Sequence, residues 1–144
     1  MAPLRSVLLI DDNPDDNTIH TIWLQRSGAV ASREDVIVKE NGLEGLVFLQ
    51  KWKKNSEKLG QRFPPPLILL DINMPVMGGF EFLEKLTELD LDLGSIVLVM
   101  LTSSDATWDR QRAAKFPIVR GYVEKPLNRT KIKALLAEHF TKPL

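Results

Sequence analysis

The 144-residue chain has no cysteine, which excludes disulfide bonds and thiolate metal sites. Its first residues lack the apolar stretch of a secretory signal, and no apolar run reaches the roughly 18–20 residues of a membrane-spanning helix. Basic and acidic residues both number 19, so the zero net charge gives no electrostatic case for nucleic acid or membrane as the main partner. Neither a Walker A motif nor Gly-x-Gly-x-x-Gly occurs, so nucleotide binding has no support. We expect a cytoplasmic protein.

The rest of the composition is that of an ordinary folded domain, with 44% hydrophobic and 26% charged residues. Its length suits a single domain, and we expect residues 1–144 to form it without an output domain. The longest polar stretch, residues 51–61, predicts an extension of the second helix, followed by a loop that the prolines at 64–66 stiffen.

Continuous apolar runs at residues 7–10, 67–70 and 96–101 are typical of strands buried on both faces of a parallel sheet. The run at 36–38 and the interrupted run at 118–123 are shorter or more polar, which indicates edge strands. Strands alternate with helical patterns, so the sequence predicts a (βα)5 α/β fold: a doubly wound, five-stranded parallel sheet. With the first, third and fourth strands central, the strand order is 2-1-3-4-5.

The helices are predicted from capping signals and from apolar residues at helical spacing. Asn13 is the expected N-cap of the first helix, and Pro14 is its first residue. The apolar faces are expected at Ile19, Ile22 and Trp23; at Leu43, Leu46 and Val47; at Phe82, Leu83, Leu86 and Leu89; and at Ile132, Leu135 and Leu136.

Polar residues that suit phosphoryl transfer follow four of the five predicted strands: Asp11 with Asp12, then Asp71, Thr102 and Lys125. Taken singly, each has an ordinary explanation as a helix start, a cap or a turn. These separate explanations give no reason for four strand ends to carry parts of one mechanism. Because the carboxyl ends of parallel strands meet at one sheet edge, we expect the five side chains to converge there.

Three carboxylates at one edge repel one another and favour a hard cation such as Mg²⁺, which takes oxygen ligands. Asp71 is the expected nucleophile, since aspartate can form an aspartyl phosphate. The Lys125 ammonium and the Thr102 hydroxyl are expected to hold the phosphoryl oxygens. The expected metal ligands are Asp12 and Asp71, Asp11 through water, and the backbone carbonyl of Asn73.

These motifs, with Met74-Pro75, Gly78-Gly79 and Tyr122 three residues before Lys125, resemble the CheY-like receiver domain of bacterial two-component response regulators. The resemblance covers essentially the whole chain. It implies that Asp71 accepts a phosphoryl group from a phosphohistidine on a sensor histidine kinase or a phosphotransfer protein. It also implies a signalling switch and not an enzyme, with only autophosphorylation from small phosphodonors and slow autodephosphorylation.

The resemblance further implies how such a switch works. In the family, the hydroxyl at Thr102 moves toward the phosphate and the aromatic ring at Tyr122 rotates inward behind it. That change remodels the face made by the fourth helix, the fifth strand and the fifth helix, through which receivers can also form homodimers. The long segment 51–61 occurs in some single-domain regulators, including ones paired with phytochrome-type kinases.

Two other functions compete with this interpretation. A phosphatase of the haloacid dehalogenase type also uses Asp and Mg²⁺, but it needs a second Asp two residues after the nucleophile, where this chain has Asn73. A constitutive interaction module would keep the fold without phosphorylation. The complete acidic set argues against that second alternative, and only chemistry decides it.

Several other residues have weaker functional interpretations. Trp108 is expected to be partly exposed on the signalling face as a partner anchor, with burial against its own helix as the alternative. The lysines of 51–58 are interpreted as a solvated helix end and not as a nucleic-acid site. His20 and His139 are interpreted as structural histidines.

Overall fold

The structure, a computed structural model, describes residues 2–102 and 107–140, and side chains within these ranges except those of residues 107–109. Its described part contains one parallel sheet with the strand order β2-β1-β3-β4-β5, as the sequence predicts. The strands are β1 (Val7–Ile10), β2 (Val36–Lys39), β3 (Leu67–Asp71), β4 (Val97–Thr102) and β5 (Val119–Glu124).

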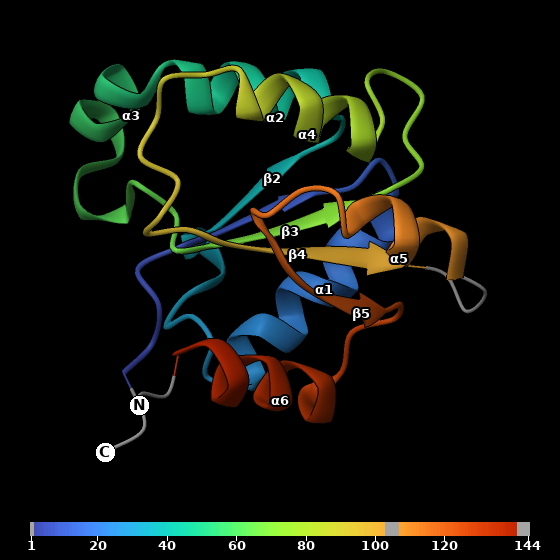
Figure 1. Ribbon diagram of the computed structural model, residues 1–144. Coiled ribbons are helices and arrows are strands. Elements are labelled where there is room, and N and C mark those ends of the chain that lie inside the picture. The colour runs from blue at the N-terminus through green and yellow to red at the C-terminus, as the bar shows by residue number, and fades with distance from the viewer. Residues whose placement is uncertain (1, 103–106, 141–144) are drawn as a thin grey trace.

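Helices cover both faces of this sheet (Figure 1). Helices α1 and α6 lie on one face, and α2, α3, α4 and α5 lie on the other. Their bounds are α1 (Pro14–Arg26), α2 (Gly42–Gln50), α3 (Trp52–Leu59), α4 (Gly79–Thr87), α5 (Thr107–Ala113) and α6 (Arg129–Phe140), with short 3₁₀ turns at Arg33–Asp35 and Gly60–Arg62. Each helix in the described residues is too short or too polar to cross a bilayer.

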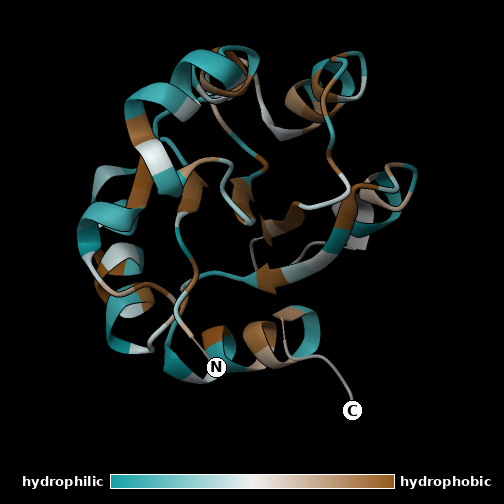
Figure 2. Ribbon diagram, turned by 90° about the vertical axis from the view of Figure 1, so that its left-hand side faces the viewer, coloured by the Kyte–Doolittle hydropathy of each residue, from teal (hydrophilic) through white to brown (hydrophobic). Residues whose placement is uncertain are grey.

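Two hydrophobic cores flank the sheet because successive strand residues point to opposite faces. In β1, Leu8 and Ile10 join the core under α2 and α4, whereas Val7 and Leu9 join the core under α1 and α6. All four side chains are fully buried. The strands are accordingly the most hydrophobic part of the ribbon, and the helices present polar residues outward (Figure 2).

The expected extension of the second helix is instead a separate helix, which gives six α-helices in the described residues where five were predicted. The chain leaves helical geometry at Lys51, with φ −88° and ψ 37°. The side-chain amide of Asn55 donates a hydrogen bond to the carbonyl of Phe48, which the break would otherwise leave without a helical partner. The new direction lets Trp52 pack edge-on against Phe63, with ring centroids 4.6 Å apart.

The predicted apolar face of α2 is partly wrong. Leu46 is buried as expected, but Leu43 and Val47 are 45% and 37% exposed. The helix turns Gly45 toward the sheet, where an added Cβ would lie 2.6 Å from the end of Ile10. This close approach places the larger residues Leu43 and Val47 on the outer side of the helix.

The predicted stripe of α1 is also partly wrong. Ile19 is 47% exposed, and Ile22 and Trp23 are only half-buried. Leu24 and His20 fill the buried positions instead. Periodicity alone could not distinguish these faces, because a histidine occupies a core position of this helix.

Candidate functional site

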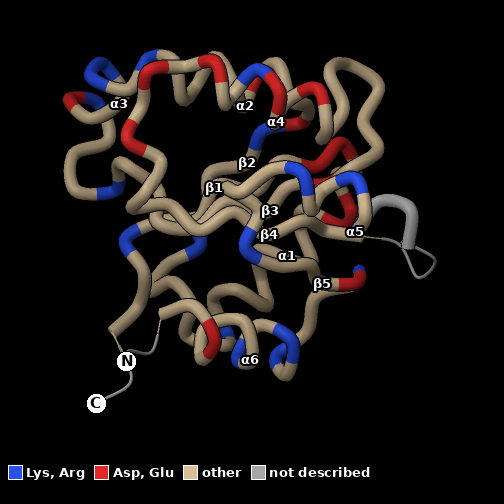
Figure 3. Tube along the Cα trace, viewed as in Figure 1, with Lys and Arg blue, Asp and Glu red and all other residues tan. Residues whose placement is uncertain are grey.

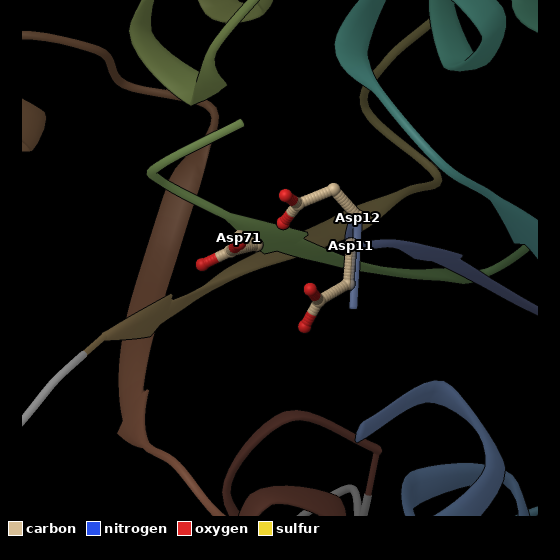
Figure 4. Close-up of side chains that lie close together, drawn as sticks. All are labelled: Asp11, Asp12 and Asp71. Atoms are coloured by element: carbon tan, nitrogen blue, oxygen red, sulfur yellow. The ribbon is translucent and has the colours of Figure 1, made fainter. Parts of the chain in front are cut away.

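Three aspartates meet where β1 and β3 end. The two strands pair in parallel with Ile10 opposite Leu70, so Asp11 and Asp71 follow directly at the same edge of the sheet. One carboxylate oxygen from each of Asp11, Asp12 and Asp71 lies within 4.8 Å of the other two (Figure 4). Asp11 is fully buried, Asp71 is 7% exposed and Asp12 is exposed.

The start of α1 fixes the position of Asp11. The backbone N–H of Asn13 donates to Asp11 Oδ1 at 3.0 Å, and the side-chain amide of Asn17 donates to the Asp11 carbonyl at 2.8 Å. Asn13 is also the N-cap, accepting from the N–H of Asp16 at 3.0 Å, and Pro14 follows it as predicted. The same short segment therefore begins the helix and orients the buried carboxylate.

Lys125 reaches this cluster from the end of β5. Its ammonium lies 2.8 Å from Asp11 Oδ2, 3.0 Å from Asp16 Oδ2 and 3.7 Å from Asp71 Oδ1. Its backbone N–H donates to the Thr102 carbonyl at 2.9 Å, which ties the position of the lysine to β4. Asp16 was not predicted as a site residue. An aspartate in the first turn of α1 is favourable for the helix, and this was a sufficient explanation of its position.

The electrostatics of the cluster follow from burial and crowding. Burial raises the pKa of Asp71 from 3.8 to about 7; Asp11 and Asp12 add to the rise, and Lys125 opposes it. Burial by itself would lower the pKa of Lys125, but hydrogen bonds to Asp11 and Asp16 outweigh it and the pKa is raised. Without a bound metal ion, the carboxylates around Lys125 thus outnumber its single positive charge. Its carboxylate oxygens suit a hard divalent metal.

A cavity of about 560 Å³ opens beside the cluster. Asp12, Asp71, Asn73 and Lys125 line it, together with Asn13, Pro14, Asp15, Ile72 and Leu101. The fully buried Asp11 is not among the lining residues. The cavity opens Asp71 to small molecules from solvent, and the predicted residue Asn73 is among its lining residues.

Thr102 ends β4, as predicted, but it does not line the cavity. It is 1% exposed, and its hydroxyl is 3.5 Å from the Val123 carbonyl, to which it donates. Tyr122 is half-buried, and its hydroxyl donates to the Arg110 carbonyl of α5 at 3.2 Å. Its hydroxyl is therefore tied to α5. The side chain of Trp108 lies outside the described residues.

His20 is fully buried next to the site, in agreement with a structural role. Its Nε2 accepts a hydrogen bond from the backbone N–H of Leu127 at 3.2 Å, so the side chain joins α1 to the segment after Lys125. Burial lowers the pKa of His20, and the nearby carboxylates of Asp16 and Asp11 oppose this shift.

Comparison with known proteins identifies the family to which this architecture belongs. Residues 7–137 match the model of the response regulator receiver domain. The chain belongs to this family. Receiver domains are signalling switches of two-component systems, not conventional enzymes; they accept phosphoryl groups from histidine kinases and bind Mg²⁺ at an acidic cluster.

Similar proteins include stand-alone receivers. The chain is 27% identical over 138 residues to protein PilH of Pseudomonas aeruginosa, covering 93% of this chain and 99% of PilH. A two-component response regulator from Cytophaga hutchinsonii has a similar structure, with a TM-score of 0.79, 25% identity and coverage of 97% of this chain and 99% of that one. The bacteriophytochrome response regulator AtBRR has a TM-score of 0.72 and 29% identity, with 98% and 97% covered.

Proposed function

We propose that this receiver is a phosphorylation-dependent switch in which Asp71 accepts the phosphoryl group from a phosphohistidine of a histidine kinase or phosphotransfer protein. The observation that carries the proposal is the meeting of three carboxylates within 4.8 Å of one another beside Lys125. A crowded acidic cluster with one adjacent cation is costly to maintain for structure alone, but it suits binding of a metal and a phosphoryl group.

Among the three aspartates, Asp71 is best placed to be the acceptor. Asp11 is fully buried and engaged by the Asn13 N–H and by Lys125. Asp12 is exposed at the rim. Asp71 lines the cavity, and its Oδ1 is 3.7 Å from the Lys125 ammonium, a looser contact than the 2.8 Å ion pair between Lys125 and Asp11. A carboxylate oxygen of Asp71 would form the new P–O bond as the P–N bond to histidine breaks, and the leaving imidazole takes up a proton.

Mg²⁺ fits the donor set of this site. The ligands we propose are the carboxylates of Asp12 and Asp71, Asp11 through water, and the backbone carbonyl of Asn73, all oxygen donors. When bound, Mg²⁺ supplies positive charge to the transferring phosphoryl oxygens. The side chain of Lys125, 3.7 Å from Asp71 Oδ1, would supply a second positive charge.

The switch would use residues already tied to the site. Lys125 would exchange part of its contact with Asp11 and Asp16 for the phosphoryl oxygens, and Thr102 would exchange the long hydrogen bond to Val123. Tyr122 donates to the Arg110 carbonyl, so inward rotation of its ring would release α5. The surface that changes is formed by α5, β5 and α6, and its partner would be a protein.

Intact-mass measurement after treatment with acetyl phosphate and Mg²⁺ tests the proposal. The wild-type chain should gain one hydroxylamine-labile phosphoryl group, and Asp71→Asn should gain none. Asp15→Asn is the matched control, because Asp15 lines the same cavity without belonging to the cluster. A wild-type chain that takes up no phosphoryl group from acetyl phosphate or from any kinase would instead be a constitutive interaction module.

The phosphodonor protein requires its own test. The similarity to AtBRR makes a phytochrome-type histidine kinase the first donor to try. Transfer from the phosphorylated kinase should label wild type and not Asp71→Asn. Multiple turnover of p-nitrophenyl phosphate would instead indicate a phosphatase, which Asn73 disfavours because an amide cannot act as the general acid.

A further inference from the structure

A second cavity, of about 490 Å³, lies along the outer side of α2 and α3. Leu43, Val47 and Phe48 give it an apolar floor. Leu43 and Val47 are two of the few large hydrophobic side chains exposed among the described residues, at 45% and 37%. We refer to this cavity as the α2–α3 groove. Exposed apolar groups gathered in a concave surface are characteristic of sites that bind another molecule.

The rim of the α2–α3 groove is strongly basic. Lys39, Lys51, Lys54 and Lys58 line it, and Glu44 is its one acidic residue. The carboxylate of Glu44 already accepts a hydrogen bond from the Asn41 side chain at 2.9 Å. In the part of the chain that the structure describes, none of the four lysines forms an ion pair. Figure 3 shows Lys and Arg positions in blue on α3, at the upper left.

We propose that the α2–α3 groove binds an acidic segment of a partner protein. Apolar side chains of the segment would contact Leu43 and Val47, and its carboxylates would meet the surrounding lysines. Charge complementarity identifies the occupant as acidic, and the apolar floor identifies it as a peptide segment with apolar side chains.

Other occupants fit the groove less well. A phosphate backbone would satisfy the lysines but leave the exposed side chains of Leu43 and Val47 without apolar contact. A second copy of this chain in a two-fold arrangement would bring lysines against lysines, because such an interface places the same surface on both sides. An acidic protein segment satisfies the rim and the floor together.

This groove is separate from the phosphoryl-acceptor site. The two cavities have no lining residue in common. Lys39 connects them only through the backbone, since its carbonyl accepts from the Asp11 N–H at 3.0 Å. The proposal therefore does not depend on phosphorylation of Asp71, and a variant in the groove should still take up a phosphoryl group from acetyl phosphate.

Fluorescence anisotropy with a labelled peptide tests the charge of the groove. The probe is a peptide of about 14 residues in which leucines recur at helical spacing among glutamates. We expect saturable binding that Lys54→Glu weakens by about fivefold or more. Lys53→Glu is the matched control, because it introduces the same change of charge on the same helix at a position outside the groove. This variant should alter affinity by less than about twofold.

A second pair of variants tests the apolar floor. Leu43→Ser should weaken peptide binding by about fivefold, since a leucine contact is lost. Ile19→Ser removes a side chain of similar exposure (47%) from α1 on the opposite face of the sheet, and it should leave binding unchanged. Circular dichroism verifies that each variant is folded.

Three results would overturn the proposal. One is absence of binding to the Glu–Leu peptide at low salt. Another is equal loss of affinity in Lys53→Glu and Lys54→Glu, which would indicate that binding depends only on the net charge of the chain. The third is tighter, Lys54-dependent binding of a short single-stranded DNA or of phosphatidylserine vesicles than of the peptide, which would assign the groove to nucleic acid or to a membrane surface.

Discussion

The ammonium of Lys125 lies 2.8 Å from Asp11 Oδ2 but 3.7 Å from Asp71 Oδ1. The lysine therefore pairs closely with the fully buried Asp11, and with Asp16 at 3.0 Å, but more distantly with the cavity-lining Asp71. This asymmetry fits the different roles proposed for the two residues. In that proposal, Asp11 organises the site and Asp71 accepts the phosphoryl group.

Replacing Lys125 should destabilise the chain and make its stability depend on Mg²⁺. In Lys125→Met the buried Asp11 loses its cation, and we expect a loss of about 1–3 kcal/mol in the free energy of unfolding at neutral pH. Mg²⁺ should recover part of this loss, because it neutralises the same carboxylates. Urea unfolding with and without Mg²⁺ measures both effects. The exposed Lys133→Met should stay within about 0.5 kcal/mol of wild type, and an equally small change in Lys125→Met would contradict the prediction.

Asp71 should make the metal-free chain less stable as the pH rises. Its pKa in the folded chain is about 7 against an ordinary value of 3.8, so between these values the folded chain holds a proton that the unfolded chain has released. The free energy of unfolding therefore falls through this window, by at most about 1.4 kcal/mol per pH unit. Asp71→Asn lacks this group and should become more stable than wild type as the pH approaches 7.

Urea unfolding in EDTA measures this difference at several pH values between about 5 and 8. The free energy of unfolding of the variant is subtracted from that of wild type, because other groups, including His20, titrate in both chains. Saturating Mg²⁺ should reduce the pH dependence, since bound metal keeps the carboxylates ionised. A difference that stays constant across the range would show that the pKa of Asp71 is not raised.

The sheet could be predicted because each strand is marked by its own composition. Continuous apolar runs such as 67–70 are buried on both faces, and the pattern needs no knowledge of distant contacts. The break at Lys51 and the exposure of Leu43 could not be predicted in the same way. They depend on Trp52 reaching Phe63 and on Gly45 contacting Ile10, which only the folded chain brings together.

The candidate site likewise has features that the sequence predicts and one that it does not. Asp11, Asp12, Asp71 and Lys125 could be predicted to meet because they follow strands whose carboxyl ends share one edge. The ion pair of Asp16 with Lys125 was missed, because a first-turn aspartate already has a sufficient explanation in its own helix. The catalytic and metal-binding roles of these residues remain predictions.

His20 should stabilise the fold most at neutral and alkaline pH. Removal of its side chain in His20→Ala leaves a cavity and an unpaired Leu127 N–H, which should cost about 2–4 kcal/mol. Because the pKa of His20 is lowered from 6.5, the unfolded chain binds a proton more readily, and this contribution declines as the pH falls below that value. Urea unfolding at about pH 7.5 and 5.5 should show the larger penalty at the higher pH. Thr18→Ala, an exposed change on the same helix, should show a small and pH-independent effect.

Gly79 should tolerate no side chain, because α4 begins against the backbone that carries Asp71. A Cβ at position 79 would lie 2.8 Å from the Asp71 carbonyl oxygen and 3.0 Å from the Ile72 Cα, and neither backbone atom can move without displacing β3. Gly79→Ala should therefore lose about 1–3 kcal/mol in urea unfolding and should also slow phosphoryl uptake from acetyl phosphate. In Gly94→Ala the new Cβ meets only an Asp92 carboxylate oxygen at 3.3 Å, and this exposed side chain can shift slightly while still accepting the hydrogen bond from the N–H of residue 94. That control should be neutral or slightly stabilising, since alanine restricts the unfolded chain. Equal stability of the two variants would show that α4 can move away from Asp71 without cost.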